Sequence, residues 1–204
     1  MTPDDTPRTL RSPEAVALRR AMLREPHIAP LAEYVAKLRL GQADWEFQDF
    51  DPLDGGTAAD MLFLLEKPGP MTSVTGKRVG SGFISRDNDD PTAENIFNFM
   101  RTAGIERKRT VLWNVMPGWN ATIHYNAAEV RHGVEQIRHL LPLLPMLRCV
   151  VLVGGPARRA QRLLQALRPD LLIHTSAHPS GQCYRFNPAL WNAIPGRWKM
   201  AGQA

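Results

Sequence analysis

The fold is decided by the stretch MLFLLEKPG at residues 61–69, an unbroken apolar run followed at once by a charged pair and a turn. Five consecutive apolar residues without alternation are typical of a strand that is covered on both faces. Similar runs follow at residues 110–115, 149–153 and 171–175. Because helix-like segments separate these runs, we expect parallel strands joined by right-handed crossovers. The sequence therefore predicts an α/β fold, a three-layer α/β/α sandwich around a central parallel sheet of about four strands.

Capping residues mark the expected helices. Ser12 followed by Pro13 is typical of a helix start, and so is Asp90 followed by Pro91, while Gly104 is typical of a helix end. We expect helices at residues 12–25, 30–40, 90–102, 126–141, 156–167 and 187–194. Residues 1–11 are interpreted as a flexible tail, and residues 12–204 as a single domain. The long segment at residues 68–91 is expected to be a loop.

Composition limits the protein class. The chain has 204 residues, a formal charge of +5 and a pI of about 9.6, which is compatible with a polyanionic partner. Its apolar runs reach only about seven residues, too few for a membrane span, and its acidic N-terminus is not a secretory signal. Two cysteines make neither a disulfide framework nor a four-cysteine cluster site. We expect a cytoplasmic protein without metal or cofactor, with Cys149 as a small core residue.

Basic residues gather in three places along the chain. Five arginines lie between residues 8 and 24, and shorter clusters lie at residues 107–109 and 158–162. Solvated helix faces are the simplest interpretation of each cluster. Lys67, Lys77 and Arg78 differ because they flank the suspected site.

Three polar residues follow or end the apolar runs. Glu66 comes directly after the first run, Asn114 lies at the end of the second, and His178 follows the fourth. Open α/β sheets bind ligands at the carboxyl ends of their strands. A carboxylate, an amide and an imidazole are thus predicted to converge on one edge of the sheet.

The order of these segments resembles the uracil-DNA glycosylase superfamily. Its first motif, written G-E-x-P-G in one branch, corresponds to LEKPG at residues 65–69; its second places an Asn at a strand end, as at Asn114; its third is His-Pro-Ser, as at residues 178–180. A Gly-Phe region between the first two motifs corresponds to residues 82–83. This chain departs from the family by having Leu65 in place of Gly. It also has Lys67 where other branches carry a catalytic Asp or Asn, or a small residue.

The resemblance implies roles for named residues. Glu66 would orient water and stabilise the sugar cation, Asn114 would read the base edge, and His178 would stabilise the departing base. Base contacts would come from Phe83, by stacking, and from Pro68 and Gly69. DNA contacts would come from Lys67, Ser85, Ser180, Tyr184 and Arg185. Residues 181–186 would form the wedge that enters the duplex, where family members usually carry an apolar residue.

The resemblance thus implies a monofunctional DNA glycosylase that uses water to remove an everted base and leaves an abasic site. Its partner would be single- or double-stranded DNA with an altered base, bound by a monomer. Uracil, a deaminated purine and a bulkier modified pyrimidine all stay open as targets, and so do repair and defence against foreign DNA. Leu65 and Lys67 motivate one alternative, a non-catalytic binder of DNA or bases. A hydrolase of small nucleosides or nucleotides is another.

Overall fold

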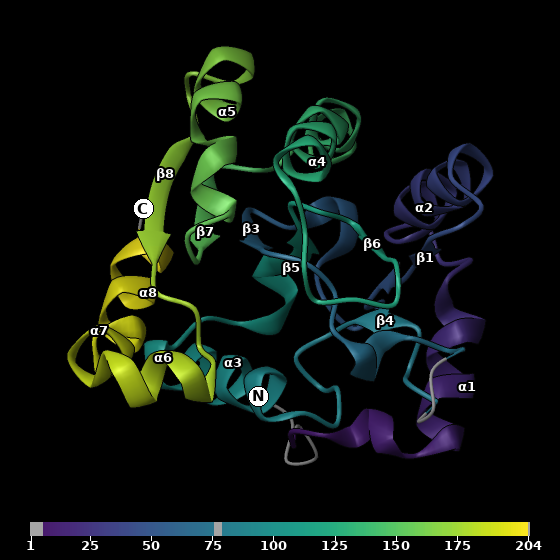
Figure 1. Ribbon diagram of the computed structural model, residues 1–204, viewed down its shortest axis with the longest axis horizontal. Helices are drawn as coiled ribbons and strands as arrows, with labels where there is room; N and C mark the ends of the chain where they lie inside the picture. Colours follow the sequence, from purple (N-terminus) through teal and green to yellow (C-terminus); the bar gives the residue numbers. More distant parts are fainter. Residues whose placement is uncertain (1–5, 76–78, 204) are drawn as a thin grey trace.

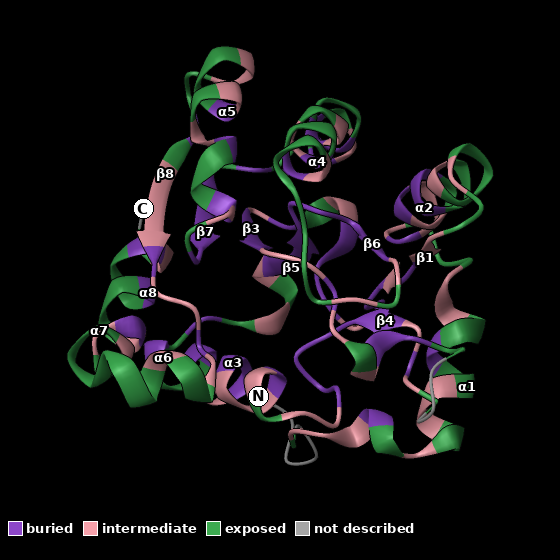
Figure 2. Cartoon of the chain, viewed as in Figure 1, coloured by how far each residue is buried: buried purple, intermediate pink, exposed green. Residues whose placement is uncertain are grey.

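The central sheet has four parallel strands, as expected. A computed structural model describes residues 6–75 and 79–203. Strands β3 (Met61–Leu65), β5 (Thr110–Asn114), β7 (Cys149–Val153) and β8 (Leu172–Ser176) lie in the order β5-β3-β7-β8. Every residue of β3, β5 and β7 is buried, while β8 is a partly exposed edge strand, a contrast that Figure 2 shows. The predicted parallel sheet is confirmed.

The direction of each crossover determines which face its helix covers. The chain moves from β3 to β5 in one direction across the sheet, and from β5 through β7 to β8 in the other. Right-handed crossovers therefore place α3 (Pro91–Ala103) on one face and both α4 (Ala127–Leu140) and α5 (Gln161–Leu167) on the opposite face, as Figure 1 shows. The result is the predicted three-layer sandwich.

Helix starts follow the capping chemistry of the sequence. The Asp90 carboxylate accepts hydrogen bonds from the Thr92 and Ala93 amides, both at 2.9 Å, at the start of α3. Asn126 and Glu129 form a capping box at the start of α4. Helices α1 (Pro13–Met22) and α2 (Ala29–Gly41) also begin close to their predicted positions.

Four two-residue strands were not predicted, because so short an element carries no readable periodicity. Strand β1 (Glu46–Phe47) pairs antiparallel with β6 (Gly118–Trp119). Strand β2 (Asp49–Phe50) pairs in parallel with β4 (Phe83–Ile84). The pairing of β4 with β2 holds residues 83–84 in place, within the segment at residues 68–91 that was expected to be one long loop.

The C-terminal region differs from the single helix predicted at residues 187–194. It forms α6 (Gly181–Phe186), α7 (Pro188–Asn192) and α8 (Ile194–Gly202). Helix α8 packs on the same face as α3, where the Trp198 ring meets Phe63 at 5.0 Å and Phe99 at 6.0 Å between centroids. Pro195 lies in the first turn of α8, where proline is well tolerated.

The N-terminal residues are packed as far as they are described. The Arg8 guanidinium lies 2.8 Å from Glu94 and 3.1 Å from Asp89, and Leu10 is buried. Residues 6–11 thus differ from the flexible tail that was expected, while residues 1–5 lie outside the described part. No helix among the described residues combines the length and apolarity needed to cross a bilayer. Cys149 is buried and both cysteines are free.

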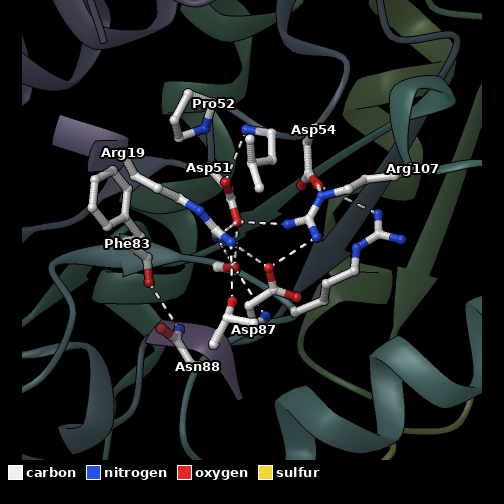
Figure 3. Close-up of polar contacts among 12 residues, drawn as sticks. Arg19, Asp51, Pro52, Asp54, Phe83, Asp87, Asn88 and Arg107 are labelled. Atoms are coloured by element: carbon white, nitrogen blue, oxygen red, sulfur yellow. Dashed lines mark hydrogen bonds and ion pairs between the residues drawn. The ribbon is translucent and has the colours of Figure 1, made fainter. Parts of the chain in front are cut away.

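A buried charge cluster ties α1 to the segment that follows β4 (Figure 3). Arg19 binds Asp51 and Asp87, each at 2.5 Å. Arg107 binds the same two carboxylates at 2.8 and 2.9 Å and lies 3.0 Å from Asp54. The full cluster consists of Arg19, Asp51, Asp54, Arg86, Asp87 and Arg107. Arg19 and Arg107 were expected on solvated helix faces, a prediction that is wrong because the cluster pairs their charges in the interior.

Asp54 is the member of this cluster whose ionisation is least favoured. Burial raises its pKa to about 6, even though Arg86 and Arg107 oppose the shift. The neighbouring carboxylates of Asp51 and Asp87 raise it further. This group therefore titrates far above the ordinary range of an aspartate.

Candidate active site

A cavity of about 280 Å³ lies at the carboxyl end of the sheet. The chain leaves β3 toward one side of the sheet and leaves β7 toward the other, so this edge is a topological switch point, where open α/β sheets bind ligands. The cavity is slightly smaller than sites that hold drug-sized ligands, roughly 300–1,000 Å³. Residues from β3, β4, β5, α3 and the connecting loops line it: Leu65, Lys67, Pro68, Gly69, Pro70, Met71, Thr72, Ile84, Ser85, Asn88, Asp90, Thr92, Ala93, Ile96, Leu112, Asn114 and His178.

Asn114 is the clearest candidate for a ligand-binding group in this cavity. It is the last residue of β5, lies beside Leu65 in the sheet and is only 5% exposed. Its side-chain oxygen Oδ1 is buried and has no hydrogen-bond partner among the described residues. Leaving a buried acceptor unsatisfied costs about 1–3 kcal/mol. An amide held in this state is suited to a ligand that presents a polar edge.

His178 lies in the loop that follows β8, and its ring packs against Gly154 at the end of β7. A Cβ atom at Gly154 would lie 3.5 Å from both Cβ and Cδ2 of His178, and the φ of Gly154 is +92°, which favours glycine. Asn95 of α3 donates a hydrogen bond to the carbonyl of Pro179 at 2.9 Å and so fixes this loop. Burial lowers the pKa of His178, which favours the neutral imidazole at pH 7.

Glu66 does not line the cavity. Its neighbours Leu65 and Lys67 both line the cavity, but Glu66 does not. Burial and, after it, the interaction with the Glu66 carboxylate raise the pKa of the Tyr125 phenol. The structure therefore brings Asn114 and His178 together and leaves Glu66 at the rim.

Lys67 contributes to the cavity wall, but its ammonium group is occupied elsewhere. It donates hydrogen bonds to Asn120 Oδ1 at 2.6 Å and to the carbonyl of His124 at 2.9 Å. It also lies 5.3 Å from the centre of the Trp45 ring. Burial lowers the pKa of Lys67. The contacts give this lysine a structural task, anchoring the loop after β6, while Pro68 and Gly69 line the cavity.

Phe83 lies outside the cavity. It is 0% exposed in β4, and the next residue, Ile84, lines the cavity instead. Among the described residues, no phenylalanine, tyrosine or tryptophan lines the cavity. A shift of one residue along a strand exchanges the faces, so the Gly-Phe pattern identified the right segment and the wrong side chain. Aliphatic groups such as Ile84 and Leu112 would contact a bound base.

The two candidate phosphate-binding serines already have partners. The buried Ser85 hydroxyl donates to the Asp51 carboxylate and accepts from the Asp87 amide at 2.9 Å. This contradicts the phosphate-binding role of Ser85, because its hydroxyl is held inside the protein. The Ser180 hydroxyl accepts from the Cys183 amide at 3.3 Å and caps α6.

The predicted wedge at residues 181–186 is helix α6. Tyr184 is 55% exposed, and its ring packs on Trp191 at 5.0 Å between centroids. The exposed Arg185 guanidinium lies 5.5 Å from the ring of Phe186. Lys77 and Arg78, which were expected to flank the site, lie outside the described residues.

One acidic residue in the cavity was missed as a functional group. Asp90 is the only residue with a carboxylate among the described residues that line the cavity. In the sequence Asp90 is recognisable only as a helix cap, because a capping aspartate carries no further signal. Burial raises the pKa of Asp90 above the ordinary value, against the two amide hydrogen bonds that lower it. Within the described residues, no group of three His, Cys, Asp or Glu side chains could hold a metal ion.

Comparisons with known proteins give a fold-level likeness. No family model and no curated protein matches the chain. SMUG2 of Pedobacter heparinus matches with a TM-score of 0.47 and 14% identity, over 72% of this chain and 75% of that one. A mimivirus UNG variant in complex with UGI matches with a TM-score of 0.40 and 15% identity, over 83% of this chain and 70% of that one.

Both chains are similar to this protein in structure, at low sequence identity. Since both TM-scores lie below 0.5, the case for an activity rests on the cavity and its residues.

Proposed function

We propose that the protein is a DNA glycosylase that hydrolyses the N-glycosidic bond of an everted, altered base. Water would attack C1′ as the C1′–N bond breaks, and the bonding electron pair would leave with the base. The base would take up a proton, and the sugar would keep a hydroxyl at C1′ as an abasic site. The observation that carries this proposal is the buried, unpartnered oxygen of Asn114 in a cavity of about 280 Å³.

Asn114 would recognise the base by its polar edge. A side-chain amide both donates and accepts hydrogen bonds, so it can pair with the adjacent N–H and C=O groups of a nucleobase. The aliphatic walls supplied by Ile84, Ile96 and Leu112 would contact the faces of the ring. Such a pocket binds a flat heterocycle and excludes the water that competes for its hydrogen bonds.

His178 would stabilise the departing base. Its lowered pKa favours a neutral ring at pH 7, and a neutral imidazole still has one N–H group to donate. Negative charge develops on the base oxygen as the bond breaks, and a donor already aimed at that oxygen stabilises the transition state. The contacts of this loop with Gly154 and Asn95 would hold the ring in place.

A carboxylate is needed where positive charge develops on the sugar. Asp90 is better placed for this role than Glu66, because Asp90 lines the cavity while Glu66 interacts with Tyr125. In this role the ionised Asp90 would stabilise the sugar cation and orient the attacking water.

The test is a panel of oligonucleotides that each carry one altered base, such as uracil, hypoxanthine or a bulky 5-substituted pyrimidine. Incubation with the protein and then with alkali would cut the strand wherever an abasic site has formed. We expect cleavage with at least one base and a loss of roughly 10- to 100-fold in Asn114→Ala, the cost of an unmade hydrogen bond.

Asn192→Ala, on the exposed surface of α7, is the matched control and should keep the wild-type rate. Absence of strand cleavage with every base would refute hydrolysis. Tight binding of the same oligonucleotides in that case would identify a non-catalytic binder.

A further inference from the structure

A second cavity, of about 530 Å³, lies apart from the candidate active site. Its walls include residues of α1, α2 and β1, which lie together at the right of Figure 1. Thr72 is the one described residue that lines both cavities. The volume is nearly twice the 280 Å³ of the cavity at Asn114 and falls within the range of ligand sites, roughly 300–1,000 Å³. The proposed hydrolysis gives this second cavity no role.

Gln48 gives the second cavity a buried polar group without a partner. The residue connects β1 to β2, is 2% exposed and lines the cavity. Its side-chain oxygen Oε1 is buried and accepts no hydrogen bond from any described residue. The neighbouring residues Phe47 and Asp49 are each paired in a short strand, which holds this position in place. An unsatisfied buried acceptor is unfavourable, so a ligand that donates a hydrogen bond here would gain affinity.

Two arginines on the same cavity have N–H groups to offer. Arg39 of α2 donates from Nε and Nη2 to the Phe47 carbonyl, at 3.0 and 2.6 Å, and its Nη1 makes no hydrogen bond to a described residue. Arg20 of α1 is exposed and forms no hydrogen bond or ion pair with a described residue. Its guanidinium lies beside Gly82, where an added Cβ atom would be 3.6 Å from Nη2. Guanidinium groups with free N–H bonds are suited to bind a phosphate.

The carboxylates of the second cavity already have partners. Glu46 accepts hydrogen bonds from three donors of the segment at residues 73–75. Asp49 pairs with Arg39 at 3.0 Å. Burial raises the pKa of Asp49, and the charges of Arg39 and Arg20 oppose that shift. Among the described residues, Arg20 is therefore the charged group of this cavity that is free to bind a ligand.

Aromatic rings form another part of the wall. Trp45 is half-buried and Phe47 is 5% exposed, and both line the second cavity. Flat aromatic side chains stack on nucleobases of any sequence. The second cavity thus combines an unpaired cation, an unsatisfied acceptor and aromatic surface. A nucleotide has the three matching parts, namely a phosphate, base N–H groups and a flat ring.

We propose that the second cavity binds a nucleotide unit, either a free nucleoside monophosphate or a nucleotide of a DNA strand. The phosphate binds Arg20 and Nη1 of Arg39. The base lies against Trp45 and donates an N–H group to Gln48 Oε1. The larger volume suits a base together with its sugar and phosphate. Binding here breaks no bond, so this inference does not depend on the proposed hydrolysis.

The experiment measures binding of the common 2′-deoxynucleoside monophosphates to the full chain by isothermal titration calorimetry. At least one of them should bind, and the nucleoside without its phosphate should bind about 10-fold more weakly or less. Arg20→Gln should weaken binding of the monophosphate about 10-fold or more, the typical effect of losing a hydrogen bond to a charged group. Gln48→Leu removes the acceptor and should weaken binding about three- to tenfold.

Arg24→Gln is the matched control for charge, because Arg24 is exposed just after α1 and does not line the cavity. It should keep the wild-type affinity for the monophosphate. Asn114→Ala should keep that affinity as well, since Asn114 lines the other cavity. Because Arg20 is exposed, its replacement does not threaten folding, and urea unfolding should show Gln48→Leu to be no less stable than wild type.

A short, unmodified single strand of DNA distinguishes the two sources of the nucleotide. A strand that displaces the monophosphate, and binds more weakly to Arg20→Gln than to Arg24→Gln, identifies a nucleotide of a strand, while a strand that does not displace it identifies a free nucleotide. No binding by any monophosphate or by the strand, or equal affinities in Arg20→Gln and Arg24→Gln, would overturn the assignment. A loss of binding in Asn114→Ala would do the same, because it would place the ligand in the candidate active site. None of these results depends on whether the base panel gives abasic sites.

Discussion

Replacing Asp90 by Asn separates the two roles of this residue, which are to cap helix α3 and to place a negative charge in the cavity. Asn is as good an N-cap as Asp, so Asp90→Asn keeps both 2.9 Å bonds to the first turn of α3. Only the attraction of a negative charge to the helix terminus is lost, about 0.3–1 kcal/mol. Asp90→Ala would lose the cap as well, at about 1 kcal/mol.

The activity should respond much more strongly than the stability. A group that acts as a general acid or base typically contributes about 10²- to 10⁴-fold to the rate, and Asp90→Asn should therefore lower kcat by a factor in that range. Single-turnover release of the base from an oligonucleotide measures this loss, and urea unfolding measures the stability. Asp89→Asn is the matched control, because Asp89 does not line the cavity and pairs with Arg8 at 3.1 Å.

Glu66, the other candidate carboxylate, should matter less for the rate. Glu66→Gln should change kcat by less than Asp90→Asn, because Glu66 does not line the cavity and interacts with Tyr125. The opposite ranking, with wild-type rates in Asp90→Asn and a large loss of rate in Glu66→Gln, would refute our assignment of the catalytic carboxylate to Asp90. It would assign that role to Glu66 instead.

Three further predictions concern other parts of the molecule. Since burial lowers the pKa of His178, its ring should stay neutral to a lower pH than a free imidazole, which titrates at about 6.5, and a kcat/KM that rises as the pH falls from about 8 to 6.5 would contradict a neutral donor. Asp54 has a pKa of about 6 in the folded protein and about 3.9 when unfolded, so its contribution to stability is lost as the pH rises from 4 through 6. The free energy of unfolding of Asp54→Asn, measured with urea and relative to that of the wild type, should therefore rise by up to about 3 kcal/mol between pH 4 and 7. A difference that stays constant over this range would contradict the raised pKa of Asp54. Gly133→Ala would put a Cβ 2.0 Å from the Val115 carbonyl oxygen and should lower the unfolding free energy by about 1–3 kcal/mol, whereas an unchanged midpoint would show that α4 moves without cost.

The architecture was predictable because its signals are local. An apolar run such as residues 61–65 is fully buried in the structure, and Asp90 and Asn126 cap the helices that their side chains indicated. The positions of Asn114 and His178 at one cavity were predictable for a related reason. Each lies at or just after a strand end, and in a parallel sheet all carboxyl ends meet at one edge.

The errors arose where orientation or partners decide the outcome. Glu66 and Phe83 were placed in the right segments, but a single step along a strand determines which side of the sheet a side chain faces. Arg19 and Arg107 looked like solvated charges because their carboxylate partners lie far away in the sequence. The same is true of Ser85, whose hydroxyl is taken by Asp51. Contacts of that kind form only after the chain has folded.

The buried charge cluster makes the pocket depend on the beginning of the chain. Arg19 belongs to α1, while Ser85 and Asp87, which its guanidinium contacts, belong to the wall segment that includes the lining residues Asn88 and Asp90. Removing the first 22 residues would delete one cation from among three interior aspartates and free one side of that wall. Because α1 contributes no strand to the sheet, such a shortened protein could retain its sandwich while its pocket loosens, so an inactive fragment with native-like circular dichroism would be no argument against the proposed activity.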